Sequence, residues 1–545
     1  MTQHESSARP QRAVVIGAGV AGLATAGLLS RDGYDVVVLE KEHQVGGRAG
    51  VLVDEDFRWD MGPSWWLMPE AFEHFYQLFD TSVEEELDLV YLNDPAFRIF
   101  TQGYPALEIS TGHQNVYELF EQLEPGSGPV IERYLRGMET DYRMAIERFL
   151  YTNFTQLRGL ATPDILGKLG RLLRSLTRSL DADVTKRFRD TRLRQLLSYA
   201  AVFLSSAPKS TPALYGILNY TTLVEGVAYP MGGFSTFVDS LHRLATQAGA
   251  TILTGAEVLH IEQDDASKGK RGRVAGVLYR NESGQHRIEA DVVVSCADRQ
   301  HTESQLVAGA RASRPRYWKR RNPGMSCVLA YLGVAGDLPE LAHHSLIFSR
   351  DWDADFAAVF SQHRTSASSN RSQFSESLYL CRPSATDPTV APAGYENLFV
   401  LIPVPAMDDG IVGNLNHSED PETTVIVDAA IDLVAERTGI ADLAQRIVKR
   451  HTVGPGDFQD RFNAWQGNAL GLAHTLSQSA FFRGSNVSKY LDGLYFAGST
   501  TAPGVGLPMC LISAENVVKR LRDDTTTGPV QTPLDPIATP DTHNR

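Results

Sequence analysis

Three glycines near the N-terminus have the spacing of a phosphate-binding turn. Gly17, Gly19 and Gly22 form G-x-G-x-x-G directly after the apolar run of residues 13–16. In such a turn the first glycine permits the tight bend, the second lets the backbone approach a pyrophosphate, and the third lets the next helix pack on the strand. The N-terminus of that helix would offer free N–H groups to the phosphates. The pattern therefore predicts a dinucleotide-binding strand–turn–helix unit.

An acidic residue ends the second apolar run of this unit. Glu40 follows the run of residues 36–39, and a carboxylate at this position can accept hydrogen bonds from ribose hydroxyls. A lone G-x-G-x-x-G also opens purely structural βαβ units. The order of strand, helix, second strand and acid favours nucleotide binding, and the acid favours a cofactor without a 2′-phosphate.

A second glycine pair with an arginine follows Glu40. The pattern E-x-x-x-x-x-GGR runs from Glu40 to Arg48, and WDMGPS follows at residues 59–64. These motifs resemble the FAD-binding flavoprotein superfamily that includes amine oxidases, carotenoid desaturases and the GDP-dissociation inhibitors. The resemblance implies FAD as cofactor. The cofactor-binding residues that it implies are Gly17, Gly19, Gly22, Glu40, Lys41, Gly46, Gly47, Arg48, Gly62, Pro63, Ser64, Val258, Gly498, Ser499, Gly506, Leu507 and Pro508.

The C-terminal part carries a matching signal. Residues 494–521 read as a short strand, a glycine-rich turn and a final helix. In the resembled superfamily this segment brings a strand end and a helix N-terminus against the flavin, and such a terminus is a favourable place for phosphate. A glycine-rich loop that only caps a helix is the alternative.

The middle of the chain resembles the bacterial-type phytoene desaturases and related carotenoid oxidoreductases. The segments that carry this resemblance are DMGPSWWLMP at 60–69, VAYPMGG at 227–233, LAHHSLIF at 341–348 and the glycine-containing block at 458–482. It implies an FAD-dependent phytoene desaturase of carotenoid biosynthesis that transfers hydride to flavin N5. A ketolase or oxygenase, a late-step or shorter-chain desaturase and a carotenoid isomerase share the same features. An amine oxidase and a non-catalytic prenyl-lipid carrier fit less well.

The acid or base of such a reaction is poorly determined by the sequence. Asp164 lies where the resembled family has its acidic candidate, although the usual arginine companion has no clear match. Glu225 lies between two tyrosines, and His343 and His344 are of a type that ionises near neutral pH. Helix capping and buried hydrogen bonding are the alternative roles of these residues. Flavin and water could also suffice without a side-chain base.

Composition sets the broad class of the protein. The chain has 545 residues, a net charge of −14 and four widely spaced cysteines without a C-x-x-C pair. The charge argues against nucleic-acid binding. The cysteine spacing argues against a disulfide framework or a zinc site, so we expect no metal. Residues 1–12 lack the apolar core of a signal peptide, and the longest near-apolar run, 14–29, is too short to span a bilayer.

The order of motifs predicts an α/β protein with a discontinuous Rossmann-like FAD-binding domain and an inserted α+β domain. We assign the FAD-binding domain to 12–80, 230–305 and 490–522, and flexible tails to 1–11 and 524–545. The inserted region, 81–229 and 306–489, is expected to bind substrate and membrane. Within the FAD-binding domain, residues 273–280 and 286–296 predict a hairpin around a turn at 281–284.

A basic stretch indicates where a membrane could be contacted. Residues 156–194 contain ten Lys/Arg and four Asp/Glu, with leucines at helical spacing. Such a helix can lie on an anionic membrane surface, although an ordinary solvated helix has the same pattern. We therefore expect a cytoplasmic protein that is peripherally associated with the cell membrane. Its expected partners are phytoene and a quinone or oxygen as electron acceptor.

Overall fold

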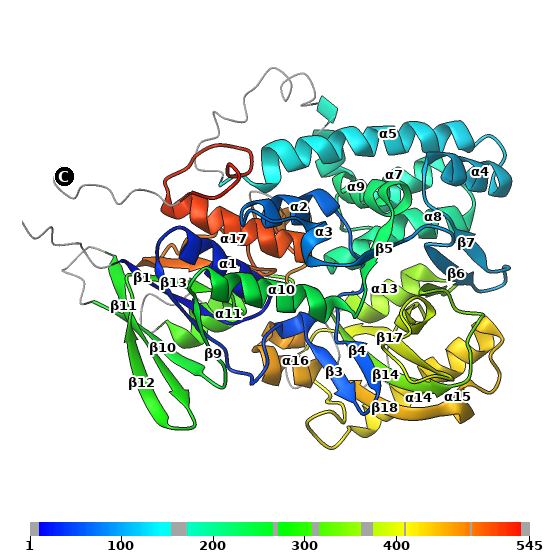
Figure 1. Ribbon diagram of the computed structural model, residues 1–545. Coiled ribbons are helices and arrows are strands. Elements are labelled where there is room, and N and C mark those ends of the chain that lie inside the picture. Colours follow the sequence, from blue (N-terminus) through cyan, green and yellow to red (C-terminus); the bar gives the residue numbers. More distant parts are fainter. Residues whose placement is uncertain are drawn as a thin grey trace, which may run out of the picture.

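A five-stranded parallel sheet carries the glycine motifs at the ends of its strands (Figure 1). The computed structural model describes residues 10–153, 170–171, 173–264, 271–307, 315–360, 374–407, 410–479 and 482–535. The strand order is β20-β13-β1-β2-β9. The bounds are β1 Arg12–Ile16, β2 Asp35–Leu39, β9 Thr251–Leu253, β13 Val292–Ser295 and β20 Leu494–Phe496. The α/β fold class that the sequence predicts is confirmed.

Helices cover one face of this sheet and a smaller sheet covers the other. The helices are α1 Val20–Arg31, α10 Phe234–Gln247 and α17 Leu507–Leu521. Alternate residues of β1 divide between the two sides, because Ala13 and Val15 belong to the helix-side core and Val14 and Ile16 to the opposite one. Burial on both faces explains why these strands are nearly continuous runs of apolar residues.

The smaller sheet has four strands in the described part of the chain. Its strands β10 Glu257–Gln263, β11 Gly272–Asn281 and β12 Gly284–Glu289 pair antiparallel, and the short β19, Leu491–Asp492, pairs in parallel with β11. The predicted turn at 281–284 joins β11 to β12. The predicted hairpin is confirmed as far as Glu289. Its continuation was wrong, because Val292–Ser295 leaves the hairpin and pairs in parallel with β1 as β13. This segment is buried throughout, as a central parallel strand is.

A seven-stranded mixed sheet forms the second layer of the molecule, in the order β18-β14-β17-β16-β15-β6-β7. The bounds are β6 Phe97–Thr101, β7 Leu107–Ile109, β14 Met325–Ala335, β15 His344–Phe348, β16 Leu378–Cys381, β17 Tyr395–Pro405 and β18 Ile447–Val453. Helix α14, Pro421–Thr438, packs its apolar face on one side of the sheet. A layer of helices lies over the other side (Figure 1).

The helical layer consists mainly of α4, α5, α7, α8 and α9. Their bounds are His113–Leu123, Gly128–Ala145, Leu180–Arg187, Thr191–Ser198 and Ile217–Tyr220. Two π-helical turns, η2 Ile146–Leu150 and η6 Thr221–Glu225, follow α5 and α9 directly.

Shorter elements connect these layers. The strands are β3 Val51–Asp54, β4 Phe57–Asp60, β5 Leu89–Leu92, β8 Val227–Pro230 and β19 Leu491–Asp492. The helices are α2 Pro69–Gln77, α3 Val83–Glu86, α11 Arg299–His301, α12 Pro315–Trp318, α13 Trp352–Phe360, α15 Leu443–Arg446 and α16 Pro455–Phe462.

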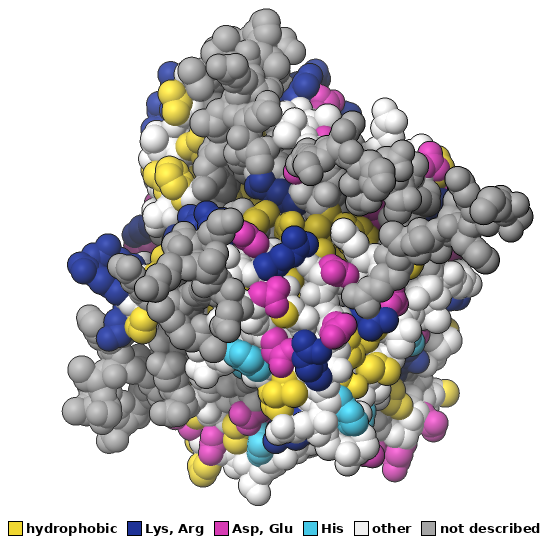
Figure 2. Space-filling view, turned by 90° about the vertical axis from the view of Figure 1, so that its left-hand side faces the viewer, with side chains coloured by type: hydrophobic (Ala, Val, Ile, Leu, Met, Phe, Trp, Pro, Cys, Tyr) yellow, Lys and Arg dark blue, Asp and Glu magenta, His cyan; other side chains and the backbone are white. Residues whose placement is uncertain are grey.

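The surface seen in Figure 2 carries charges of both signs, and its hydrophobic side chains occur in small groups among them. Among the described residues no helix combines the length and the apolar character that a bilayer crossing requires.

The contact between α1 and the glycine turn allows a direct test of the fold. A Cβ atom at Gly22 would lie 1.8 Å from the carbonyl oxygen of Gly17, which belongs to the backbone and cannot move aside. We expect Gly22→Ala to cost about 3 kcal/mol of stability and to abolish FAD retention. Gly170→Ala is the matched control, since a Cβ at this helical glycine meets no atom within 4 Å. Thermal unfolding and bound flavin absorbance measure both effects, and equal behaviour of the two variants would contradict the prediction.

Candidate functional site

One large cavity lies between the parallel sheet and the helical layer. It encloses about 3440 Å³ of empty space, including its opening to solvent. All seventeen residues that the resemblance implies for FAD binding line it, from Gly17 in the first turn to Pro508 in the last helix. The structure thus brings together groups that lie almost 500 residues apart in the sequence. Their individual contacts with FAD stay predictions.

The glycine turn is held to the second strand by a carboxylate. Glu40 is buried, and its Oε2 accepts a hydrogen bond of 2.6 Å from the backbone N–H of Ala18. Its Oε1 accepts one of 2.9 Å from the N–H of Glu42. Burial raises the pKa of Glu40, and the two backbone donors act in the opposite direction. Glu40 therefore orders the turn and also lines the cavity.

Two helix N-termini open into the cavity. Helix α1 begins after Gly19 and α17 begins after Gly506, and neither cap residue has a side chain that could accept from the first N–H groups. Both cap glycines line the cavity. A helix N-terminus without a side-chain cap is well suited to bind phosphate oxygens.

Arg48 supplies positive charge to the same cavity. One of its amino groups donates to the carbonyl oxygen of Asn468 at 3.3 Å, whereas its buried Nε has no hydrogen-bond partner. Burial lowers the pKa of Arg48 and the charge of Asp298 raises it; an arginine stays protonated in proteins. A desolvated guanidinium with an unused donor fits an anionic pyrophosphate. The residues present therefore fit FAD.

The other part of the cavity is apolar. Its walls are mainly aliphatic and aromatic side chains of the helical layer and the seven-stranded sheet, among them Phe203, Ile217, Leu218, Leu329 and Phe399. Such a surface offers few groups to a charged ligand and suits a hydrocarbon.

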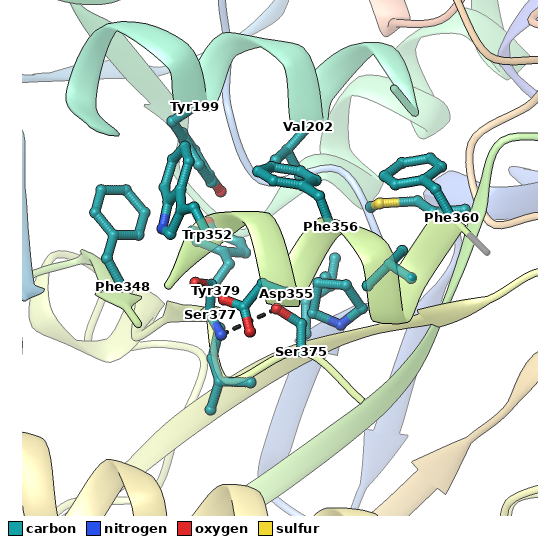
Figure 3. A pocket seen from close by; sticks show the side chains of 15 residues that line it. Tyr199, Val202, Phe348, Trp352, Asp355, Phe356, Phe360, Ser375, Ser377 and Tyr379 are labelled. Atoms are coloured by element: carbon teal, nitrogen blue, oxygen red, sulfur yellow. Dashed lines mark hydrogen bonds between the residues drawn. The ribbon is translucent and has the colours of Figure 1, made fainter. Parts of the chain in front are cut away.

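A smaller aromatic pocket adjoins this part. Tyr199, Val202, Met325, Tyr379 and Leu401 line both spaces. Figure 3 shows Tyr199 and Val202 pointing from one helical segment toward Trp352 and Phe356 of α13. The pocket has about 470 Å³ of empty space, including its opening to solvent. At most one end of a long ligand fits in it.

The carboxylate in this smaller pocket is fully hydrogen-bonded. Asp355 accepts from the hydroxyl groups of Ser349 and Ser377, both at 2.5 Å, and from the backbone N–H of Glu376 at 3.0 Å. These hydrogen bonds connect α13 to the neighbouring loop. Because they use the carboxylate fully, the role of Asp355 is structural.

Asp141 is a cavity residue that the sequence analysis missed. It lies on α5, is 4% exposed and lines the apolar part of the cavity. Its Oδ2 accepts a hydrogen bond of 2.9 Å from Arg171. The sequence could have indicated Asp141, because it lies on the apolar face of an amphipathic helix, seven residues after the buried Tyr134.

Of the predicted catalytic residues that the structure describes, Glu225, His343 and His344, none lines the cavity. Asp164 lies outside the described residues. Glu225 is half-buried at the end of η6, where burial and the charge of Glu70 raise its pKa to about 7, and it is not part of the described cavity wall.

The two histidines lie behind the cavity wall. His344 Nδ1 and the hydroxyl group of Tyr379 are 2.8 Å apart, and that hydroxyl is 2.6 Å from Ser64 Oγ. Ser64 and Tyr379 line the cavity, so His344 is separated from it by one side chain. Burial lowers the pKa of His344, and that of His343 to about 3, so neither is suited to hold a proton at neutral pH.

Part of the predicted basic helix borders the cavity. Leu176 lines its apolar part, and Leu173 is 52% exposed. Residues 156–169 and 172 of this stretch lie outside the described ranges, and contact with a membrane stays a prediction.

Comparison with known proteins agrees with this geometry. The family model of the flavin containing amine oxidoreductases matches residues 20–522. The chain is 38% identical over 512 residues to a carotenoid 3,4-desaturase of Haloarcula japonica, which covers 94% of this chain and 98% of the relative. It is 32% identical to a zeta-carotene-forming phytoene desaturase of Myxococcus xanthus, with 95% of each chain covered.

Solved structures of this fold are more distant in sequence. A putrescine oxidase structure superposes with a TM-score of 0.58 at 13% identity, covering 94% of this chain and 99% of the other. The chain belongs to the flavin containing amine oxidoreductase family, within the group of the carotenoid desaturases. It is an FAD-dependent oxidoreductase, which confirms the predicted enzyme class and cofactor.

The position of Glu40 predicts the effect of its removal. We expect Glu40→Ala to weaken FAD binding at least tenfold, because a hydrogen bond to a charged group contributes about 1.5–3 kcal/mol and the turn loses its tie to β2. Equilibrium titration of the apoprotein with FAD measures this affinity. Glu42→Ala is the control, since the hydrogen bond to Glu40 comes from the backbone N–H of Glu42, which this substitution keeps. Unchanged affinity in Glu40→Ala would remove Glu40 from the binding site.

Proposed function

We propose that this protein desaturates a carotenoid, with phytoene as the substrate that the sequence analysis favours. The observation that supports this most is the continuity of the cavity, which joins a phosphate-binding end to a long apolar end. A carotenoid hydrocarbon has no charged group, so binding must come from burial of apolar surface and from shape. The names of the two curated relatives point to the same substrate class.

Desaturation removes a hydride and a proton from neighbouring carbon atoms of the polyene. FAD, when bound, supplies the two-electron oxidation. The protein contributes orientation of the polyene between apolar walls and exclusion of water. It also provides a carboxylate at Asp141 as acceptor for the proton. Arg171 holds this carboxylate in place through a hydrogen bond of 2.9 Å.

A carotenoid that is already partly conjugated is the second candidate substrate. The higher identity to a carotenoid 3,4-desaturase than to a phytoene desaturase favours it, since 38% compares with 32% over similar lengths. The two candidates place the same chemistry at different points of the polyene.

Turnover with defined substrates distinguishes these candidates. Purified FAD-loaded protein is incubated with liposomes that contain either phytoene or a partly conjugated carotenoid, with oxygen or with a quinone under nitrogen. New long-wavelength bands in the phytoene extract would establish phytoene desaturation. Bands that shift only with the conjugated substrate would select the second candidate. No shift with either substrate, in protein that retains FAD, would contradict the proposed function.

The role of Asp141 is tested by a change that removes its basicity. We expect Asp141→Asn to lower the desaturation rate by about 10²-fold or more, the usual range for loss of a general base, with FAD content unchanged. Glu139→Gln is the control on the same helix, because Glu139 is paired with Arg143 at the surface. A rate within twofold of the unmodified protein in Asp141→Asn would exclude this residue as proton acceptor.

A further inference from the structure

Three metal-ligating side chains gather behind the cavity wall. His343 directly precedes β15, His344 begins that strand, and Cys381 ends β16. The antiparallel register of these strands places His344 directly opposite Cys381. One ligand atom from each of the three residues lies within 4.8 Å of the other two, and all three residues are buried.

Both imidazole rings are held through one nitrogen and leave the other unused. His343 Nδ1 is 2.8 Å from Thr386 Oγ1, and His344 Nδ1 is 2.8 Å from the hydroxyl group of Tyr379. The Nε2 atoms of both rings are buried and have no hydrogen-bond partner. A buried polar atom without a partner is costly. Histidines that bind metals are commonly oriented in this way through their second nitrogen.

Aromatic packing fixes the positions of the two rings. The ring of His344 is stacked on Trp65 with centroids 4.6 Å apart, and the ring of His343 meets Tyr229 edge-on at 4.7 Å. The two imidazoles contact each other at a centroid distance of 4.5 Å. The rings are therefore preorganised, and little conformational entropy is lost when they bind an ion.

The charge of the ligand set bears on which ion it could hold. Neutral imidazole and thiolate are the forms of histidine and cysteine that bind metals. The nearby cation, Arg382, is paired with Glu396 at 2.7 Å. Two imidazoles and one thiolate give zero net charge with a monovalent ion and one positive charge with a divalent ion, and a buried charge is costly.

We propose that His343, His344 and Cys381 bind one copper ion as Cu(I). Thiolate and imidazole are ligands that copper accepts, and a His₂Cys set is typical of trigonal copper sites, whereas structural zinc sites almost always have four ligands. Ligand atoms on one ion lie about 3–4 Å apart at the usual bond lengths, so small side-chain movements suffice. The ion would connect β15 to β16 behind Tyr379. The proposal does not depend on the proposed carotenoid substrate.

Metal binding by the FAD-loaded protein tests the proposal. The protein is titrated anaerobically with Cu(I) against a chromophoric chelator, and bound copper is counted after gel filtration. We expect one equivalent in the unmodified protein and none in Cys381→Ser or His344→Ala. Flavin absorbance in each variant reports that it has folded. Cys327→Ser is the matched control, because Cys327 is equally buried in the same sheet on β14, and it should retain the copper.

X-ray absorption at the copper edge of the unmodified protein gives a second readout that needs no variant. Two nitrogen ligands and one sulfur ligand would support the site even where Cys381→Ser fails to fold. The proposal would be overturned if the protein bound no copper tightly or took zinc and not copper. It would also be overturned if Cys381→Ser kept the copper or if Cys327→Ser lost it.

Discussion

The hydrogen bond from the backbone of Ala18 to Glu40 connects the parts of the molecule on which the cofactor site depends. It fixes the glycine turn to the end of β2. The next turn is tied to the first by the hydrogen bond from Gly46 N to Ala18 O at 2.8 Å. Gly46 and Gly47 then direct Arg48 into the cavity. The backbone of Ala18 thus fixes the positions of β1, β2 and both glycine turns relative to one another. It thereby also positions Arg48.

The parallel sheet has a second role, since it collects segments that are remote in the sequence. β1, β13 and β20 are neighbours, although they come from the beginning, the middle and the end of the chain. Their carboxyl ends point to the same edge, where ligands bind in open α/β sheets. The chain between them forms the seven-stranded sheet and the helical layer, whose inner surfaces are apolar. The cavity therefore changes from polar to apolar at the boundary of the two layers.

Local sequence was sufficient to predict the parts of this site that short motifs encode. The residues of the two glycine turns and of the C-terminal turn could be predicted because backbone geometry there restricts the residue type, as it does at Gly22. The fold class followed from the order of these motifs. The strand Val292–Ser295 was misassigned because a hairpin strand and a buried parallel strand have similar short apolar patterns.

Groups that depend on tertiary contacts could not be found in this way. Asp141 and Arg171 are separated by thirty residues, and nothing local relates them. Cys381 meets His343 and His344 only through the pairing of β15 with β16, so cysteine spacing alone gave no indication of the cluster.

In the proposed reaction, electrons removed from a carotenoid pass to the FAD of this protein. A single turnover without an electron acceptor measures this transfer. FAD-loaded protein is mixed under nitrogen with substrate-loaded liposomes, and the flavin and polyene bands are recorded together. We expect flavin bleaching and polyene formation to occur at the same rate and in equal amounts. A change in the polyene bands without flavin reduction would indicate isomerisation and would exclude desaturation by this flavin.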